Sequence, residues 1–539
     1  MLTAFPAIIV WSGSESLITG SDLDQLEASG SFLGAYQLLR EALRSGHVVS
    51  RLDQVFHRLG RLNQRLNRHP QAERAYHLAL QINSARPTTL NNLAVLRMAA
   101  LDYPAADHWL SVGLALSGVE PKDRSLLLNS ACELRLYQRR PSEARDLAQE
   151  QIRVLDQPRA QVNLSLSLRA LNDLEGALVH QQRAVQQWCA SQVLDDAALL
   201  SCIGRRRAEG LSATIQFHLT VMNFAIARLS IDPFDRNAQQ LLLSGAGIEP
   251  FSWADSNFFS RLWRGQHVKE LVLWHDQGYG DAIQNLVWIE EVSQRVDRLR
   301  LFVRASLMRL VKERMSLPAN CSLEAMNPQC PPWQLGSAHL GLWFAPLNFG
   351  GWGPDQPPML RCSLSRSRGV FNRPQSPRVG LVWMAGRHQA PQPELAARLR
   401  DLPFDHLNRR VPIWVERFQA QCFSLQLDTD HPPEGPVREL VDRGMLATPL
   451  KSSGDWLDTL RLVETMDFVL TVDTAMAHLC GAVGIPCVVL LNTPCDWRWG
   501  QSGDRTFLYD SIRLARCPAP HAWDQAMVTV DRWIAEWMP

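Results

Sequence analysis

The strongest constraint on the fold is a segment that recurs along the first half of the chain. It resembles Pro-Gln-Ala-Glu-Arg-Ala and begins at Pro70, Pro104, Pro141 and, more loosely, Leu174, with offsets of 34, 37 and 33 residues. A second short segment recurs with a similar period and begins at Asn92, Asn129 and Asn163, with offsets of 37 and 34 residues. Small residues at fixed positions let two helices approach closely, and leucines recur at helical spacing. The pattern therefore predicts pairs of helices that stack on their neighbours.

A period near 34 residues resembles the tetratricopeptide repeat. We expect roughly four repeats between residues 31 and 190, after an N-terminal segment at residues 1–30. Residues 191–250 keep a helical pattern and are expected to cap the array, so that the helical region spans residues 31–250. Solenoids of this class present concave surfaces to peptides or partner proteins. The alternative is that the repeats only support the second half of the chain.

The chain has 539 residues, which is too long for a single hydrophobic core and indicates about three or four domains. A formal net charge of +1 gives no electrostatic footprint for nucleic acid or an anionic membrane surface. The 11 cysteines are scattered and form no Cys-x-x-Cys pair, which favours reduced thiols over a disulfide framework or a zinc site. We expect no signal peptide, and the sequence contains no apolar stretch long enough to span a membrane. We therefore expect a cytoplasmic protein.

Near residue 250 the pattern changes to short aliphatic runs that alternate with helical segments. The runs lie at residues 271–274, 299–303, 379–383, 423–425, 468–472 and 487–491. Such alternation predicts α/β layers around a mostly parallel sheet. A segment rich in Gly, Pro, Ser and Arg at residues 345–377 is predicted to be a linker. It would divide two Rossmann-like domains, residues 251–375 and 376–539, that face each other across a cleft.

Four motifs occur in order along this half of the chain. They are residues 276–284 (Asp-Gln-Gly-Tyr-Gly-Asp-Ala-Ile-Gln), 378–383 (Arg-Val-Gly-Leu-Val-Trp), 473–479 (Asp-Thr-Ala-Met-Ala-His-Leu) and 496–499 (Asp-Trp-Arg-Trp). Together, behind a helical repeat array, they resemble the glycosyltransferases similar to the lipopolysaccharide heptosyltransferases (glycosyltransferase family nine), in the form preceded by tetratricopeptide repeats. The architecture also resembles that of the protein O-linked N-acetylglucosamine transferases. The resemblance covers about residues 31–535 and speaks more for the fold than for the activity.

The resemblance implies a GT-B fold, with the acceptor side in the first Rossmann-like domain and the sugar-nucleotide donor in the second. It also implies inverting transfer without a metal or a cofactor, because helix termini and basic side chains neutralise the departing diphosphate. Asp428-Thr429-Asp430 imitates an Asp-x-Asp metal motif, but it follows a predicted strand and is expected to be a loop. The amphipathic helix predicted at residues 523–537 would cross back onto the first Rossmann-like domain.

Asp281 is the candidate catalytic base. Sugar transfer requires a group that takes the proton from the acceptor hydroxyl. Asp281 follows a Gly-x-Gly turn at the end of a predicted strand, and the resemblance implies this role because the matching Asp is the base in the heptosyltransferases. The alternative interpretation is a helix N-cap, for which Asp is also favoured.

The donor site is predicted at the start of the helix that follows the strand at residues 468–472. Helix N-termini favour anions, and ligands bind at the carboxyl ends of parallel strands. Asp473, Thr474 and Ala475 lie at this point, and Asp473 and Thr474 could cap the helix and bind the nucleotide-sugar as well. His478 lies about one helical turn further on. It could donate a hydrogen bond to phosphate, or it could be a structural residue.

Two arginines and a glycine complete the predicted donor-binding set. Arg387 is implied to contact the diphosphate, although its loop departs from the usual family pattern. Arg498 could reach phosphate, and Gly280 would let the backbone approach the ligand. Trp497 and Trp499 could pack against the nucleotide base, but core packing is the favoured interpretation.

The predicted function is therefore that of a hexosyltransferase or a heptosyltransferase-like enzyme, which transfers a sugar from a nucleotide-sugar donor to a protein, peptide or glycan acceptor. The solenoid favours a protein or peptide, whereas the sugar and the nucleotide are not readable from the sequence. The first alternative is a non-catalytic repeat-protein adaptor with a degenerate GT-B-like module, suggested by the altered loop at residues 384–400. The second alternative is a regulator that binds nucleotide without turning over a sugar donor.

Overall fold

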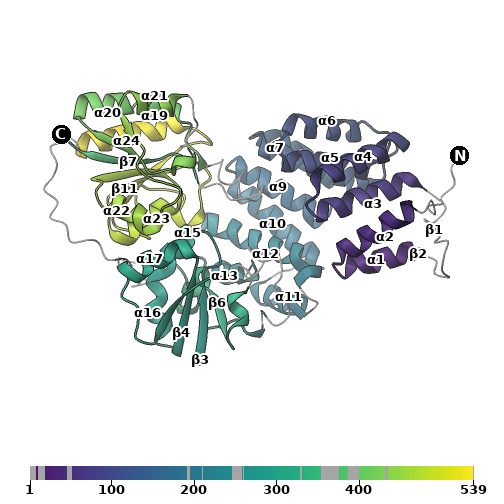
Figure 1. The fold of residues 1–539 in the computed structure, drawn as a ribbon, viewed down its shortest axis with the longest axis horizontal. Coiled ribbons are helices and arrows are strands. Elements are labelled where there is room, and N and C mark those ends of the chain that lie inside the picture. Colours follow the sequence, from purple (N-terminus) through teal and green to yellow (C-terminus); the bar gives the residue numbers. More distant parts are fainter. Residues whose placement is uncertain are drawn as a thin grey trace. The chain divides into compact units, whose positions relative to one another are not determined.

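The computed structural model describes residues 8–9, 18–44, 51–190, 195–208, 211–245, 258, 260–327, 330–353, 364, 376–385, 400–430 and 435–537. The chain forms two compact units, Met1–Leu168 and Arg169–Pro539 (Figure 1). In the part of the chain just given, no helix is long and apolar enough to cross a membrane.

The first unit is built from helices, with one short antiparallel strand pair at its start, β1 (Ile8–Ile9) with β2 (Ile18–Thr19). The helices that begin in this unit are α1 (Gly20–Ala28), α2 (Phe32–Arg44), α3 (Leu52–Arg65), α4 (His69–Ile82), α5 (Pro87–Ala99), α6 (Tyr103–Leu114), α7 (Pro121–Tyr137), α8 (Pro141–Val154) and α9 (Pro158–Ala170). Consecutive helices pack in pairs, α3 with α4, α5 with α6 and α7 with α8. Figure 1 labels the first two pairs. The prediction of a tetratricopeptide-like helical array is confirmed.

The recurring sequence segment explains both where the second helix of each pair begins and how closely it packs. Pro70, Pro104 and Pro141 lie in the first turn of α4, α6 and α8, where the missing N–H costs no helical hydrogen bond. The alanines two or three residues further on have no exposed surface: Ala72, Ala106 and Ala144. Their small side chains allow the close approach of the paired helices that the sequence predicts.

The second unit opens with further helices, α10 (Leu174–Cys189), α11 (Asp196–Ala208), α12 (Leu211–Ile231), α13 (Arg236–Leu241) and the short η1 (Leu242–Gly245). These helices share one hydrophobic core with the sheets that follow. Gln239 exchanges two hydrogen bonds of 2.9 Å with the backbone of Trp352. The helices expected to cap the repeats are therefore present within residues 195–208 and 211–245, and they form part of the α/β body.

The first sheet has four parallel strands in the order β5-β4-β3-β6. The strands are β3 (Val268–Trp274), β4 (Val296–Val303), β5 (Cys321–Ala325) and β6 (His339–Gly341). The helices of this domain are α15 (Tyr279–Asn285), η2 (Leu286–Trp288), α16 (Ile289–Ser293), α17 (Ala305–Arg314), η3 (Pro332–Gln334) and η4 (Leu342–Phe349). The sequence predicts β3 and β4 but misses the other two, because β5 is partly exposed and β6 has only three residues.

The second sheet has six parallel strands in the order β12-β11-β10-β7-β8-β9. The strands are β7 (Arg378–Val382), β8 (Gln421–Ser424), β9 (Leu446–Ala447), β10 (Phe468–Val472), β11 (Cys487–Leu491) and β12 (Ile512–Arg516). The helices of this domain are α19 (Asp405–Asn408), α20 (Val411–Phe418), η6 (Asp428–Asp430), α21 (Pro436–Asp442), α22 (Trp456–Val463), α23 (Ala475–Val483), η7 (Trp497–Trp499) and α24 (Trp523–Trp537). The predicted fold class, a helical repeat array followed by a parallel α/β region with two sheets, is confirmed. Most of the predicted linker, at residues 354–363 and 365–375, lies outside the described residues.

The C-terminal helix α24 packs on the second sheet. Trp523, Val530 and Ile534 belong to the same core as β7, β10 and β11. Arg410 Nε donates to Asp531 Oδ2 at 2.9 Å, which ties α24 to the start of α20. The expected crossing of this helix onto the first Rossmann-like domain is wrong for residues 523–537, because its apolar face is already covered by its own domain.

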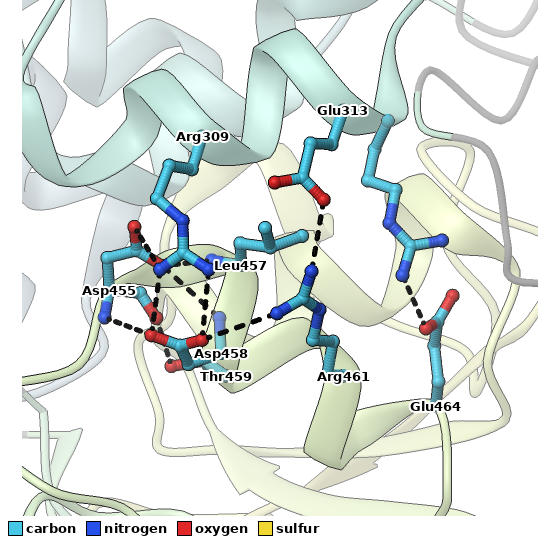
Figure 2. A network of polar contacts seen from close by, with 9 residues as sticks. Arg309, Glu313, Asp455, Leu457, Asp458, Thr459, Arg461 and Glu464 are labelled. Atoms are coloured by element: carbon cyan, nitrogen blue, oxygen red, sulfur yellow. Dashed lines mark hydrogen bonds and ion pairs between the residues drawn. The ribbon is translucent and has the colours of Figure 1, made fainter.

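Two helix pairs join the domains that carry the two sheets, α15 with α23 and α17 with α22. The second pair is held by a network of charged side chains, most of which Figure 2 shows. Its ion pairs are Arg309 with Asp455 and Asp458, both at 3.1 Å, Arg461 with Glu313 at 3.0 Å, and Arg314 with Glu464 at 2.9 Å. The first pair lies at the carboxyl ends of β3 and β10, where the candidate site is found.

Candidate functional site

Asp281 lies in the first turn of α15, shortly after strand β3. The residue that precedes the helix is Gly278, and its N–H donates to Asp281 Oδ2 at 3.1 Å. Asp281 is the third residue of α15 and bonds back to the residue before the helix, so it stabilises the helix start, although the N-cap position predicted for it as the alternative belongs to Gly278. This hydrogen bond occupies one carboxylate oxygen and leaves Oδ1 for a separate contact.

Arg498, from η7 after strand β11, makes that contact. Arg498 Nη1 lies 2.5 Å from Asp281 Oδ1 and 3.0 Å from Gln284 Oε1. The side chains of Arg498 and Asp281 are 13% and 23% exposed, so water screens this ion pair only partly. The structure thus brings the predicted base and the predicted phosphate-binding arginine into direct contact.

Asp496 binds the same guanidinium. Arg498 Nε and Nη2 donate to the two Asp496 carboxylate oxygens at 3.1 and 3.3 Å. Burial raises the pKa of Asp496, but the charge and hydrogen bonds of Arg498 outweigh it and lower the pKa to about 2. Burial lowers the pKa of Arg498, yet the charges of Asp496 and then Asp281 raise it well above its ordinary value. One permanently charged arginine therefore forms ion pairs with two carboxylates from different domains.

The N-terminus of α23 carries the predicted donor-binding residues. Thr474 is the N-cap, and its Oγ1 accepts a hydrogen bond from the Met476 N–H at 3.3 Å. Asp473 follows β10 directly and is only 7% exposed. Burial raises the pKa of Asp473, although the nearby Arg400 charge acts in the opposite direction. Arg400 Nη1 donates to the Asp473 carbonyl oxygen at 3.0 Å and lies 3.8 Å from its Oδ2.

His478 and Gly280 lie where α15 and α23 meet. A Cβ atom at Gly280 would come within 2.7 Å of His478 Cδ2 and 3.2 Å of the Ala475 Cα. His478 Nδ1 lies 3.0 Å from the Tyr509 hydroxyl, and its ring stacks on Trp499 at 5.3 Å between centroids. Burial, and then the charge of Arg498, lower the pKa of His478 to about 3. In this conformation Gly280 permits helix packing and His478 is a neutral buried residue, so their contacts with a donor remain predictions.

A second carboxylate, Asp276, lies between strand β3 and the candidate base in the chain and is not among the predicted site residues. Its Oδ1 accepts from the Trp343 N–H at 3.0 Å, whereas its buried Oδ2 has no hydrogen-bond partner. Burial raises the pKa of Asp276 to about 7, and the charge of Asp281 adds to the increase. The sequence places Asp276 in the same motif, but no local signal distinguishes a buried acid from an exposed one.

The remaining predicted residues have different outcomes. Arg387 lies outside the described residues, whereas Arg400 contacts the loop after β10. Trp497 and Trp499 are 3% and 2% exposed, in agreement with the favoured interpretation of core packing. Asp428 accepts backbone hydrogen bonds from Ser452 and Thr429 at 2.8 and 3.0 Å and so shapes the loop after β8. The described part of the chain contains no group of three or more His, Cys, Asp or Glu side chains placed to hold a metal ion.

No protein-family model matches this chain. No curated protein matches it either. The resemblance to the heptosyltransferases therefore finds no support from these comparisons.

Several solved structures do match. A mutant of the O-GlcNAc transferase from Thermobaculum terrenum covers 85% of this chain and 84% of that chain, at 12% identity and a TM-score of 0.32. A structure of pilF from Pseudomonas aeruginosa covers 41% of this chain and 94% of that chain, at 16% identity and a TM-score of 0.29. A tetratricopeptide repeat protein from Parabacteroides merdae covers 42% and 91%, at 14% identity and a TM-score of 0.29. Similarity at this level establishes no activity for the present chain.

Proposed function

We propose that the chain is a glycosyltransferase that moves a sugar from a nucleotide-sugar to a hydroxyl group of a protein or glycan. One observation carries the proposal. At the carboxyl ends of β3, β10 and β11, strands of two parallel sheets, the loops bring Asp281, Asp473 and Arg498 together with the N-terminus of α23. This edge of a parallel sheet is where α/β proteins bind nucleotides and phosphorylated ligands.

The residues supply the two functions that the reaction requires. The acceptor hydroxyl oxygen forms a bond to the anomeric carbon, and the bond from that carbon to the diphosphate oxygen breaks. Asp281 takes the proton that the acceptor loses. Arg498 and the N–H groups at the start of α23 stabilise the negative charge that develops on the departing diphosphate.

The pairing of Asp281 with Arg498 sets the order of these events. Both oxygens of Asp281 are engaged, one by the Gly278 N–H and one by Arg498. A diphosphate that binds Arg498 competes with Asp281 for the guanidinium and frees Oδ1 to accept a proton. Donor binding therefore precedes activation of the acceptor in the proposed mechanism.

The same pairing favours a second candidate function, that of a non-catalytic adaptor. Asp496 and Asp281 already satisfy the charge of Arg498, and His478 is buried between α15 and α23. An adaptor would keep these contacts permanently as the structural joint between the two sheet domains, and the repeats would hold its partner.

Thermal unfolding in the presence of UDP-, GDP-, ADP-, CMP- and dTDP-sugars tests the proposal, because a ligand that binds only the folded state raises Tm. We expect one nucleotide class to raise Tm for the wild type and for Arg443→Gln, which alters an exposed arginine. We expect a smaller increase for Arg400→Gln, which removes the cation beside Asp473. No increase with any nucleotide-sugar at millimolar concentration supports the adaptor. Binding without sugar transfer to any acceptor tested supports a nucleotide-binding regulator.

A further inference from the structure

Two thiols outside the candidate site lie unusually close together. Cys189 is the last residue of α10, Cys202 lies in the middle of α11, and their sulfur atoms are 3.0 Å apart. Cys189 is partly exposed and Cys202 is buried. Both are free thiols in this structure. A separation of 3.0 Å is shorter than ordinary contact between two sulfur atoms, so little movement separates this arrangement from a covalent bond.

The surrounding contacts hold the two sulfur atoms in position. Arg206, one turn beyond Cys202, donates from Nη2 to the carbonyl oxygen of Trp188 at 3.2 Å and lies over the Trp188 ring at 6.0 Å. The start of α11 is anchored separately, because Arg228 of α12 donates to Asp196 at 2.6 Å. The ends of α10 and α11 are therefore fixed beside each other by contacts that do not depend on the thiols.

We propose that Cys189 and Cys202 are a redox modification site, which hydrogen peroxide converts into a reversible intramolecular disulfide between α10 and α11. The Cys189 thiolate attacks one peroxide oxygen, the O–O bond breaks, and a sulfenic acid and one water molecule form once protons are balanced. The Cys202 sulfur then attacks the Cys189 sulfur and displaces the hydroxyl group as a second water molecule. Two S–H bonds are lost and one S–S bond forms, while peroxide receives the two electrons.

Accessibility and environment set the order and the rate of these steps. Cys189 reacts first because its partner is buried. Burial and the neighbouring Cys202 raise the pKa of the Cys189 thiol to about 12, while Arg206 and Arg205 act in the opposite direction. The thiolate is therefore scarce at neutral pH, and the reaction is expected to be slow and to accelerate as pH rises.

Mass-spectrometric peptide mapping of the intact chain tests the proposal. The protein is reduced, freed of reductant, exposed to hydrogen peroxide, alkylated with iodoacetamide and digested. We expect a cross-linked pair of peptides that carries Cys189 and Cys202, with a mass lower by two hydrogen atoms than that of the two free peptides. Dithiothreitol should return both peptides to the alkylated form, and the cross-linked yield should be higher at pH 9 than at pH 7.

Three variants sharpen the assignment. Cys189→Ser and Cys202→Ser should each abolish the cross-linked peptide. Cys132→Ser should retain it, because Cys132 is a buried thiol of α7 whose sulfur contacts are the Ala144 carbonyl and the Ser167 hydroxyl. The proposal is overturned by one result that is obtained with the wild type and needs no variant to fold. In that result Cys202 is still fully alkylated after peroxide treatment, whether Cys189 is unmodified or is oxidised without forming a disulfide.

Discussion

Arg498 Nη1 lies 2.5 Å from Asp281 Oδ1, which joins the loop after β11 to the helix after β3. The contact links the domains of the two sheets at the place where ligands bind in parallel α/β folds. It also means that, in the free protein, the carboxylate of the candidate base Asp281 and the guanidinium of the candidate phosphate-binding residue Arg498 neutralise each other's charge. In the proposed mechanism, a bound diphosphate separates them.

Asp281→Asn should abolish sugar transfer while it preserves donor binding. Asn has the same shape and keeps one oxygen for Arg498, but its NH2 group cannot accept from the Gly278 N–H and its amide cannot take the acceptor proton. Loss of a general base typically lowers kcat by about 100-fold to 10,000-fold. Nucleotide affinity should rise roughly threefold to tenfold, because a neutral amide competes less well for Arg498 than a partly exposed carboxylate does. Turnover and calorimetric affinity are measured against Asp504→Asn, at an exposed position; unchanged turnover in Asp281→Asn would remove this residue from the mechanism.

Arg498→Gln should destabilise the fold strongly. The substitution leaves Asp281 and Asp496 close together without their shared cation, and breaking a largely buried ion pair in this way costs about 3–5 kcal/mol. Asp496, whose pKa is lowered to about 2 by Arg498, should then titrate at a higher pH. Urea denaturation gives the free energy of unfolding, and Arg443→Gln is the surface control. A loss below about 1 kcal/mol would show that the network contributes little to stability.

Gly280→Ala should destabilise the contact between α15 and α23. The added Cβ would come within 3.2 Å of the Ala475 Cα, and the backbone of a helix cannot move aside as a flexible side chain does. Overpacking of this kind typically costs about 1–3 kcal/mol. Gly204→Ala in α11 is a matched control, since a Cβ there meets no atom within 4 Å and should stabilise its helix by roughly 0.5–1 kcal/mol. Equal free energies of unfolding for the two variants would contradict the close packing at Gly280.

Asp276 should make the stability of the protein fall as pH rises from about 4 to about 7. Its pKa is raised from 3.8 to about 7 by burial, so the folded state holds the proton more tightly than the unfolded chain does. Stabilisation by the protonated acid is complete below about pH 4 and is lost as pH approaches 7.

Asp276→Asn isolates this effect from the titration of histidines. Relative to the wild type, the free energy of unfolding of the variant should increase between pH 5 and pH 8, by an amount on the order of 3 kcal/mol. His275, whose pKa is lowered to about 3, is present in both proteins and cancels in the difference. A difference that does not change with pH would show that Asp276 is ionised throughout.

Glu464→Ala should weaken the second joint between the sheet domains. Glu464 and Arg314 side chains are 6% and 12% exposed, so the substitution removes a largely buried ion pair and should cost about 3 kcal/mol. Glu313→Ala removes an ion pair to Arg461 with 44% and 51% exposure, visible in Figure 2, and should cost less than 1 kcal/mol. Chemical denaturation distinguishes the two, and similar losses would mean that burial does not set the strength of this network.

The sequence by itself determined the local structure of this protein. Proline and alanine at a spacing near 34 residues define the helix pairs, and predominantly apolar runs define buried strands such as β10 and β11. It also placed Asp281 and Asp473 at the ends of strands, because that placement depends only on neighbours along the chain. The partly exposed edge strand β5 was not predicted because its residues carry no such pattern.

Only the tertiary structure decided which of these residues meet. Asp281 and Arg498 are 217 residues apart in the sequence, and no pattern in the residues around either of them predicts their contact. The burial that makes His478 neutral comes from α15, Tyr509 and Trp499, which different parts of the chain supply. The C-terminal helix α24 has an apolar face that either domain could cover, and packing on its own sheet settled the choice. The periodicity of apolar residues specifies a helix or strand and the face that it buries. Long-range packing decides which part of the protein covers that face, and it sets the charge state of the titratable groups buried there.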